Sequence, residues 1–235
     1  MTTDIQYETP VVAKRERQPK LERRPSLFDN LLTEVGHALH VLSRSAQAAR
    51  PNPAGRALSQ QDDSLSVEET QHAAGLMRVN HVGEICAQAL YRGQALMVKD
   101  EAIKNLLYQA SAEEVDHLVW CDDRLKELGS RPSIFNPFWY AASLGLGVVA
   151  SRAGTPYNLG FMAETERQVE KHLEEHLSSL PEADTRSRKI VDQMRVDEIA
   201  HRTTAEDHGA HNLPLPIKTA MRIMSKVMTT TAYKW

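Results

Sequence analysis

Few features of this sequence point to a disulfide-rich, nucleic-acid-binding or strand-containing protein. Only two cysteines, Cys86 and Cys121, occur in 235 residues, and both lie in apolar helical patterns typical of small core residues in a reducing compartment. The formal net charge of −3 gives no general case for binding nucleic acid. No run of alternating apolar and polar residues is bounded by hairpin turns, so strands are not expected. A composition that is 41% hydrophobic is sufficient for one main core.

Residues 1–65 are interpreted as an N-terminal extension of the main domain. The N-terminus, MTTDIQYETP, lacks the apolar run of a secretory signal, so a cytoplasmic site is the default expectation. Residues 1–25 are polar and rich in charge and proline, which predicts disorder. Residues 26–46 carry leucines at helical spacing and predict an amphipathic helix. After a linker, Ser66 and Glu69 form a capping box that predicts the start of the next helix.

Four long helical patterns fill the main domain, residues 66–235, and predict an all-α fold. They cover residues 66–98, 100–128, 156–180 and 185–209. Between the second and third patterns lies an uncharged segment, residues 132–151, whose length is close to that of a membrane span. Because Pro137 and four Ser or Asn residues weaken a transmembrane interpretation, we expect a membrane-surface hairpin or a short helix there.

Two of these patterns direct a Glu and a His toward the core. The apolar face of the second pattern passes through Glu114 and His117, and that of the fourth passes through Glu198 and His201. Residues three apart on a helix are neighbours, with Cβ atoms about 5–6 Å apart, so both side chains can bind one ion. A single E-x-x-H pair is expected by chance, but two pairs on inward faces indicate a site.

The other two patterns each direct one acid inward. The apolar face of the first passes through Glu84, and that of the third passes through Glu166. Glu164 competes for the third position, but it lies about 200° around the helix from Glu166, so one of them faces the core. We choose Glu166 because the apolar stripe includes its position. On the same pattern, a solvated flank is the favoured interpretation of His172 and His176.

The arrangement repeats within the chain. Glu84 precedes Glu114 by 30 residues and Glu166 precedes Glu198 by 32, and in both halves the second Glu opens an E-x-x-H pair. One Glu from each of two helices and Glu-x-x-His from each of two others is the ligand set of ferritin-like carboxylate proteins. We therefore expect a ferritin-like four-helix bundle with additional N- and C-terminal helices. The E-x-x-H pair that starts at Glu69 is explained by the helix cap, and the alternative for the whole set is a plain bundle with solvated or surface-paired acids.

Charge balance favours two metal ions at this cluster. Burying a carboxylate costs several kcal/mol, and four together repel one another or take up protons. Two divalent ions neutralise four carboxylates. Oxygen and imidazole ligands without a thiolate disfavour structural zinc and suit iron or manganese. We choose iron because a reducible pair of ions is able to activate dioxygen.

Further polar residues lie close to the six candidate ligands. Glu113 stands one helical turn before His117, and Asp197 one turn before His201, so each acid is a candidate acceptor for the second ring N–H of its own histidine. Exposure to solvent is an equally good interpretation of both acids. Tyr91 lies near the inward face of the first pattern, where core packing is the simpler role.

Several of these segments resemble the demethoxyubiquinone hydroxylases, the membrane-associated di-iron monooxygenases of ubiquinone biosynthesis. The most specific match is RVNHVGEICAQALYRGQ, residues 78–94, which is similar to the family's first-helix signature. EEVDHL resembles the second-helix motif, DEIAH the fourth, and PFWYAASLGLGVV the membrane-facing insertion. The similarity covers about residues 70–235. The third helix departs from the family's pattern, since Thr165 stands where the family usually has Val and Leu173 where it has an aromatic residue.

The resemblance implies a di-iron centre and a reaction that uses dioxygen and two electrons. The implied iron ligands are Glu84, Glu114, His117, Glu166, Glu198 and His201. The implied reaction hydroxylates the ring of a polyprenyl methoxy-benzoquinol, with electrons from NADH or from the quinol itself. The implied location is the cytoplasmic side of a bacterial inner membrane, where peripheral binding gives access to the polyprenyl tail.

The C-terminal segment, residues 214–230, has the pattern of a helix that lies at a membrane surface. One face carries Ile217, Met221, Met224 and Val227 or Met228, and the other carries Lys218, Arg222 and Lys226. A terminal helix packed on the core is equally consistent with this spacing.

Other functions share the same candidate ligands. A ferroxidase or iron-storage bundle would use all six, but it would not need an uncharged insertion or a basic amphipathic tail. A purely structural bundle would bind no metal. The sequence leaves open whether the chain forms a homo-oligomer, whether other ubiquinone-biosynthesis proteins bind it, and what residues 1–65 do.

Overall fold

The computed structural model describes residues 27–56 and 65–234, which contain seven helices and no strand. The helices are α1 (Leu27–Leu42), α2 (Val67–Leu96), α3 (Glu101–Glu127), α4 (Asn136–Ser151), α5 (Thr155–Ser179), α6 (Thr185–Asp207) and α7 (Leu215–Lys234). The predicted all-α class is confirmed, and the four long helices agree with their predicted ranges to within two residues at each end. The disorder predicted for residues 1–25 lies outside the described residues.

Capping side chains fix where three of the long helices start. Ser66 and Glu69 make both hydrogen bonds of the predicted capping box at the start of α2. Asp100 caps α3 by accepting hydrogen bonds from the backbone N–H groups of Ala102 and Ile103, and Asp184 caps α6 by accepting one from Ser187. These carboxylates satisfy donors that a helix N-terminus otherwise leaves without a partner.

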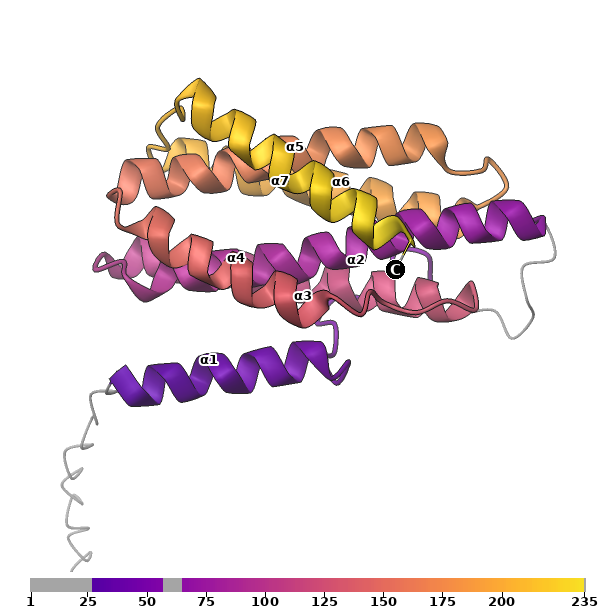
Figure 1. Cartoon of the computed structure of the whole chain (residues 1–235), viewed down its shortest axis with the longest axis horizontal. Helices are drawn as coiled ribbons and strands as arrows, with labels where there is room; N and C mark the ends of the chain where they lie inside the picture. The colour runs from indigo at the N-terminus through magenta and orange to yellow at the C-terminus, as the bar shows by residue number, and fades with distance from the viewer. Residues whose placement is uncertain (1–26, 57–64, 235) are drawn as a thin grey trace, which may run out of the picture.

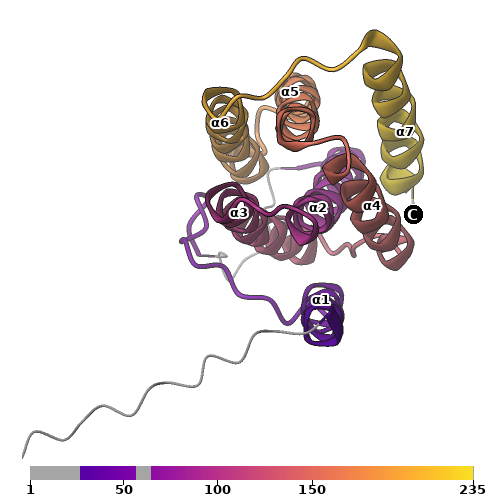
Figure 2. The ribbon, with the colours of Figure 1, turned by 90° about the vertical axis from the view of Figure 1, so that its left-hand side faces the viewer.

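The helices α2, α3, α5 and α6 form the centre of a helical bundle, which Figure 2 shows end-on. α2 packs on α3 and α5 packs on α6, and the two pairs meet through contacts of α3 with α6 and of α2 with α5. α4 lies along α2, α7 crosses α2 and α5, and α1 lies against α2 and α4 (Figure 1). The bundle therefore has four central helices and three that cover its sides.

Two apolar clusters fill the bundle at different heights. One contains Leu107, Leu159 and Met162, and the other contains Trp120, Leu173 and Met194. Along each central helix, the predicted ligand positions fall between the residues of the first cluster and those of the second. Apolar packing above and below thus shields the polar layer between them from water at both ends of the bundle.

α4 is the short helix expected within residues 132–151, and it packs closely on α2. A Cβ atom added at Gly93 would collide with the carbonyl oxygen of Leu144, and one at Gly147 would collide with that of Leu90. Glycine has no Cβ atom, so these two positions allow the helix backbones to approach. Among the described residues, no helix combines the length and the apolar character needed to cross a bilayer.

α1 turns part of its predicted apolar stripe away from the bundle. Three members of the stripe are exposed: Leu32, Val35 and Leu39. Among the described side chains of α1, Val41 and Glu34 are buried, and the Glu34 carboxylate lies 2.6 Å from Arg92 Nε of α2. An ion pair therefore helps to fix the orientation of α1, which apolar spacing alone does not predict.

α7 divides the apolar face predicted for residues 214–230 between two environments. Met221 and Met228 are half-buried and line a cavity, whereas Ile217 and Val227 are exposed. The helix thus covers one side of the bundle and also presents apolar side chains outward.

Candidate metal centre

The six predicted ligands meet in the polar layer of the bundle. Glu84 comes from α2, Glu114 and His117 from α3, Glu166 from α5, and Glu198 and His201 from α6. All six are buried, and the most exposed of them, His201, retains 6% of its accessible surface. Helical periodicity explains why each of them points into the bundle, because each residue lies on the apolar face of its helix.

The six residues form two overlapping groups, each able to hold one metal ion. One group is Glu84, Glu114, His117 and Glu198, and the other is Glu114, Glu166, Glu198 and His201. Within each group, one possible ligand atom from every residue lies within 4.8 Å of the others. Because Glu114 and Glu198 belong to both groups, their carboxylates are suited to bridging two ions.

The donor atoms at the centre of the cluster fit a pair of cations. The Glu114 carboxylate lies 2.9 Å from His117 Nδ1 and 3.2 Å from His201 Nδ1. Both Glu114 oxygens and His117 Nδ1 are buried and lack a well-formed hydrogen bond. Among the described residues, the cationic groups within ion-pair distance of the four carboxylates are these two imidazoles. Four buried carboxylates need more positive charge than that, and two divalent ions would provide it.

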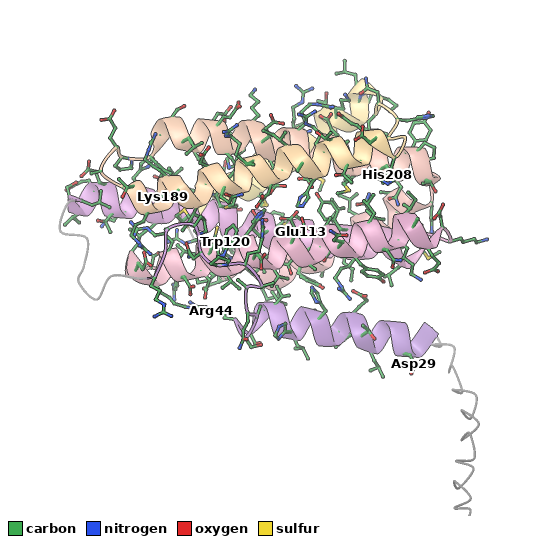
Figure 3. The ribbon with its side chains drawn as sticks, turned by 180° about the vertical axis from the view of Figure 1, so that it is seen from behind. Asp29, Arg44, Glu113, Trp120, Lys189 and His208 are labelled. Carbon is green, nitrogen blue, oxygen red and sulfur yellow. The ribbon has the colours of Figure 1, made fainter. Side chains whose placement is uncertain are left out.

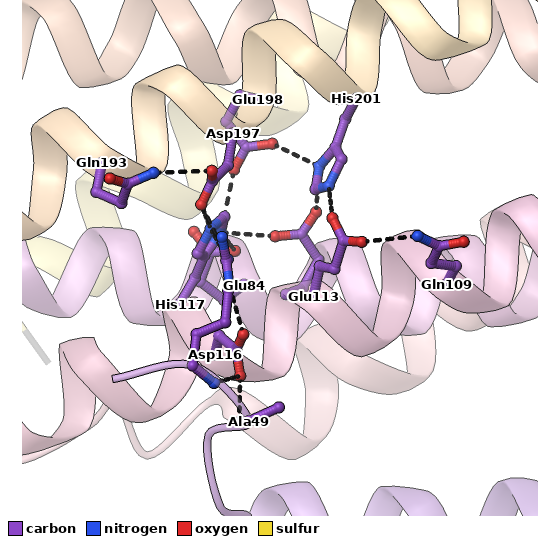
Figure 4. A network of polar contacts seen from close by, with 12 residues as sticks. Ala49, Glu84, Gln109, Glu113, Asp116, His117, Gln193, Asp197, Glu198 and His201 are labelled. Atoms are coloured by element: carbon purple, nitrogen blue, oxygen red, sulfur yellow. Dashed lines mark hydrogen bonds and ion pairs between the residues drawn. The ribbon is translucent and has the colours of Figure 1, made fainter. Parts of the chain in front are cut away.

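The outer ring nitrogens of the two histidines face carboxylates on the opposite helix. His117 Nε2 of α3 lies 2.9 Å from Asp197 of α6, and His201 Nε2 of α6 lies 2.7 Å from Glu113 of α3 (Figure 4). The expectation that each acid serves the histidine on its own helix is therefore wrong. Because Nδ1 points into the centre, Nε2 lies on the opposite side of the ring and faces the neighbouring helix. Each Nε2–H donating to a carboxylate fixes Nδ1 as the free ligand atom.

Burial and mutual repulsion determine the protonation of the cluster. Burial, followed by repulsion from Glu198 and Glu114, raises the pKa of Glu166 well above its usual value, and burial does the same for Glu84. The pKa of Glu114 is lowered, since His201 and His117 together outweigh the effect of burial. The pKa of His201 is raised because Glu114, Glu113 and Glu198 outweigh burial. The cluster thus retains protons at neutral pH that metal ions would displace.

Tyr91 and Glu164 have different roles. The Tyr91 hydroxyl donates a hydrogen bond to Glu166, so this tyrosine contacts a candidate ligand as well as packing in the core. Glu164 is also buried, but its carboxylate lies 2.7 Å from Arg167 and 3.2 Å from Lys218 of α7. The choice of Glu166 over Glu164 as the inward acid of α5 agrees with this geometry.

A largely apolar cavity of about 160 Å³, open at one side, lies next to the cluster. Its walls come from α2, α4, α5 and α7 and include Trp139, Phe161, Met221 and Met224. Glu84 belongs both to the cavity wall and to the cluster, so the cavity reaches the centre on the side of His117.

His172 and His176 are not on a solvated flank. Their ring centroids are 3.9 Å apart, His176 is buried, and His172 lines the cavity. Burial lowers the pKa of both rings, that of His176 to about 3, so both are neutral at neutral pH. The interpretation as a solvated flank is wrong because His176 is buried in the bundle and His172 lies in the cavity wall.

Sequence reasoning did not identify Arg50, which lies in the linker between α1 and α2. Its guanidinium group lies 2.9 Å from Asp197 and 2.7 Å from Asp116. No periodic pattern extends into this linker, so no signal in the sequence distinguishes this arginine. A further E-x-x-H pair, Glu34 and His37 of α1, also escaped notice, and the Glu34–Arg92 ion pair places it outside the cluster.

Comparison with known proteins identifies close relatives over nearly the whole chain. The model of the family "Ubiquinone biosynthesis protein COQ7" matches residues 71–232. A protein of Bordetella avium is 63% identical over 212 residues, which are 90% of this chain and 97% of that protein. A protein of Bordetella parapertussis is 61% identical over 213 residues, covering 91% of this chain and 95% of that protein.

A more distant relative from Ralstonia pickettii is 52% identical over 216 residues, covering 88% of this chain and all of that protein. All three relatives carry the name 3-demethoxyubiquinol 3-hydroxylase. The match extends well before residue 71, so it includes parts of the N-terminal region that the family model does not cover.

Proposed function

This chain belongs to the family of the ubiquinone biosynthesis protein COQ7, and from this membership we propose that it is a di-iron 3-demethoxyubiquinol 3-hydroxylase. The reaction converts one ring C–H bond of the quinol to C–OH. One atom of dioxygen enters the product, and the other leaves as water after two electrons and two protons are added. In this proposal the bundle is ferritin-like, with the ligands on α2, α3, α5 and α6.

The observation that carries the proposal is the pair of overlapping ligand groups beside an apolar cavity. Glu114 and Glu198 are common to both groups, as two closely spaced ions require. Glu84 adjoins both the cavity and the cluster, so an aromatic ring in the cavity would lie next to the centre. A buried ionic cluster with this access is suited to oxidising an apolar substrate away from water.

The proposed iron ligands are Glu84, Glu114, His117, Glu166, Glu198 and His201. When bound, two iron ions supply the redox chemistry that activates dioxygen. Asp197 and Glu113 hold the two imidazole rings by accepting their Nε2–H groups, and the Tyr91 hydroxyl holds Glu166. These contacts fix the ligand geometry before the substrate binds.

The cavity walls support a substrate with a polar ring and a long apolar tail. Trp139 and Phe161 supply aromatic surface, and Met221 and Met224 of α7 supply flexible apolar surface. We propose that the quinol ring occupies the inner end near Glu84 and that the polyprenyl tail leaves between α4 and α7. A tail that leaves by this route requires a membrane or another apolar phase outside.

Exposed apolar side chains near this exit support peripheral membrane binding. Phe135 and Phe138 are exposed at the start of α4, and Ile223 and Val227 are exposed on α7. α7 also carries Arg222, Lys226 and other basic residues suited to anionic lipid headgroups. We propose that this surface binds the cytoplasmic face of a bacterial inner membrane.

Flotation with vesicles that contain anionic phospholipid tests the membrane surface. We expect Val227→Asp to reduce the floated fraction severalfold, because a buried charge opposes insertion of α7. Val196→Asp is the matched control, since Val196 of α6 is 49% exposed and Val227 is 53% exposed. Equal flotation of both variants and the unchanged protein would reject this surface.

Product analysis tests the hydroxylase itself. The iron-loaded protein is reduced anaerobically, mixed with oxygen and a short-chain demethoxyquinol, and the product is examined by mass spectrometry. We expect a gain of one oxygen atom, which Glu198→Ala abolishes and Glu164→Gln preserves, since Glu164 lies outside both ligand groups. A second assay starts from the oxidised protein with oxygen and the demethoxyquinol, with and without NADH. A product that forms only with NADH indicates NADH as the electron source, and one that forms without it indicates the quinol. Oxidation of Fe²⁺ without any oxygenated quinol would instead indicate a ferroxidase.

A further inference from the structure

The linker after α1, residues 43–56, is attached to the outer surface of α3 and α6. It begins beyond Leu42 and precedes the part of the chain that the family model covers. Ala48 and Ala54 pack against the apolar cluster around Trp120, and Arg186 of α6 donates to the carbonyl oxygens of Ala54 and Arg56. Figure 3 shows this side of the molecule, with Arg44 near the end of α1 and Trp120 on α3. The linker is thus held in place on the bundle from both ends.

Asp116 of α3 fixes the position of Arg50 within this linker. One Asp116 oxygen accepts the backbone N–H of Ala49 at 2.6 Å (Figure 4). The other oxygen accepts Arg50 Nε–H at 2.7 Å. The Arg50 guanidinium carbon also lies 4.9 Å from the centre of the Trp120 ring. A charged side chain that is held by a carboxylate, a backbone anchor and an aromatic face has little freedom to move.

The same guanidinium group reaches the support of the candidate metal centre. Arg50 Nη2 lies 2.9 Å from Asp197 Oδ2, and this oxygen lies 2.9 Å from His117 Nε2. Arg50 Nη2 and His117 Nε2 are 3.4 Å apart. With Nδ1 of His117 directed at the centre, both nitrogens are donors that share Asp197 as acceptor. Arg50 therefore acts on His117 through Asp197.

We propose that Arg50 is a positioning residue for the metal ion on the His117 side of the centre. It holds Asp197 where that carboxylate accepts the Nε2–H of His117, so that Nδ1 stays aimed at Glu114 and Glu198. Through Arg50 of this linker, the N-terminal extension supports the half of the site that contains His117. This inference rests on the proposed di-iron centre. Groups that orient a metal-bound histidine typically change metal affinity by about 10–100-fold when they are removed.

Anaerobic titration of the metal-free full chain with Fe²⁺ tests this role. We expect Arg50→Gln to bind the ion on the His117 side about 10–100-fold more weakly than the unchanged protein. Arg50→Lys should fall in between, because one ammonium group keeps the charge but does not reproduce the planar contact with two carboxylates. Arg44→Gln is the matched control, since Arg44 of the same linker pairs with Asp122 of α3 at 2.7 Å and takes no part in the ligand groups.

Mössbauer spectra of the ⁵⁷Fe-loaded proteins separate positioning from general damage. We expect Arg50→Gln to alter one of two iron signals while leaving the melting temperature close to that of Arg44→Gln. Unchanged affinity and unchanged spectra in both Arg50 variants would overturn the inference and leave the di-iron centre intact. If Arg50→Gln fails to fold, wild-type affinity in Arg50→Lys overturns the inference. If the unchanged protein binds no iron, the proposed centre and this inference both fail.

Discussion

The two halves of the candidate centre have matching ligands but unequal support. In one half, His117 is fully buried and donates to Asp197, which also contacts Gln193 and Arg50 at 2.9 Å each. In the other half, His201 donates to Glu113, which receives a hydrogen bond from Gln109 at 3.1 Å. The Asp197 side chain is 14% exposed, whereas that of Glu113 is 38% exposed. The first half lies under the linker, and the second is nearer to solvent.

This difference shows that two halves with the same ligand pattern in the sequence can have different surroundings in the structure. Both halves contribute one unshared Glu, one imidazole and a shared pair of carboxylates. The cavity, however, adjoins Glu84, which belongs to the group of His117, and Tyr91 supports Glu166, which belongs to the group of His201. One half therefore combines a mostly buried support with the cavity, and the other lies against the core tyrosine.

Removing a shared ligand should break the centre in both halves. We expect Glu114→Gln to lower the affinity for both ions by more than about 100-fold and to abolish hydroxylation, since even an indirect support is worth about 10–100-fold. Glu84→Gln should affect mainly the ion of its own half, because Glu84 belongs to one group. Iron content after gel filtration distinguishes them. Loss of a single ion in Glu114→Gln would contradict the shared role.

Replacing the carboxylates that accept from the two imidazole rings should show directly that the two halves are supported unequally. We expect Asp197→Asn to lower the affinity for iron by about tenfold or more. Glu113→Gln should lower it less. The physical reason is exposure, because water can replace a half-exposed acceptor such as Glu113 more readily than a mostly buried one. Fe²⁺ titrations of both variants under identical conditions measure this. Equal losses would show that the two halves are supported alike.

Tyr91→Phe should produce a smaller effect confined to the His201 half. It removes the hydroxyl that donates to Glu166 and retains the ring. A hydrogen bond within a protein is worth about 0.5–1.5 kcal/mol net, so we expect roughly a two- to twelvefold loss of affinity for one ion. Tyr140→Phe is the matched control, because the buried Tyr140 hydroxyl has no hydrogen-bond partner in the described residues. Weaker binding of both ions would show that Tyr91 does not act on the His201 half alone.

His176 provides a reference outside both halves, with the smallest expected effect. Burial lowers its pKa from 6.5 to about 3, so the unfolded chain binds more protons than the folded chain between these values. This group therefore lowers the free energy of unfolding as the pH falls below 6.5. We expect His176→Gln to reduce that acid sensitivity in urea titrations without changing iron content. Altered iron binding would show that His176 is coupled to the centre.

Much of the candidate site could be predicted from the sequence because the ligands lie on long helices. Glu84, Glu114, Glu166 and Glu198 each fall on an apolar face, and periodicity is sufficient to direct them inward. The partners of the outer acids could not be predicted in this way. Glu113 and Asp197 cross to the opposite histidines because the far side of each imidazole meets the neighbouring helix.

The sequence by itself determined the helices and the inward direction of the six candidate ligands, since both follow from the spacing of residues along one chain segment. The tertiary structure decided which groups on different helices meet. It turned part of the α1 stripe outward, divided the face of α7 between cavity and surface, and brought Arg50 to Asp197. The physical reason is that periodicity fixes a direction around one helix axis, whereas contacts between segments depend on how their backbones pack together.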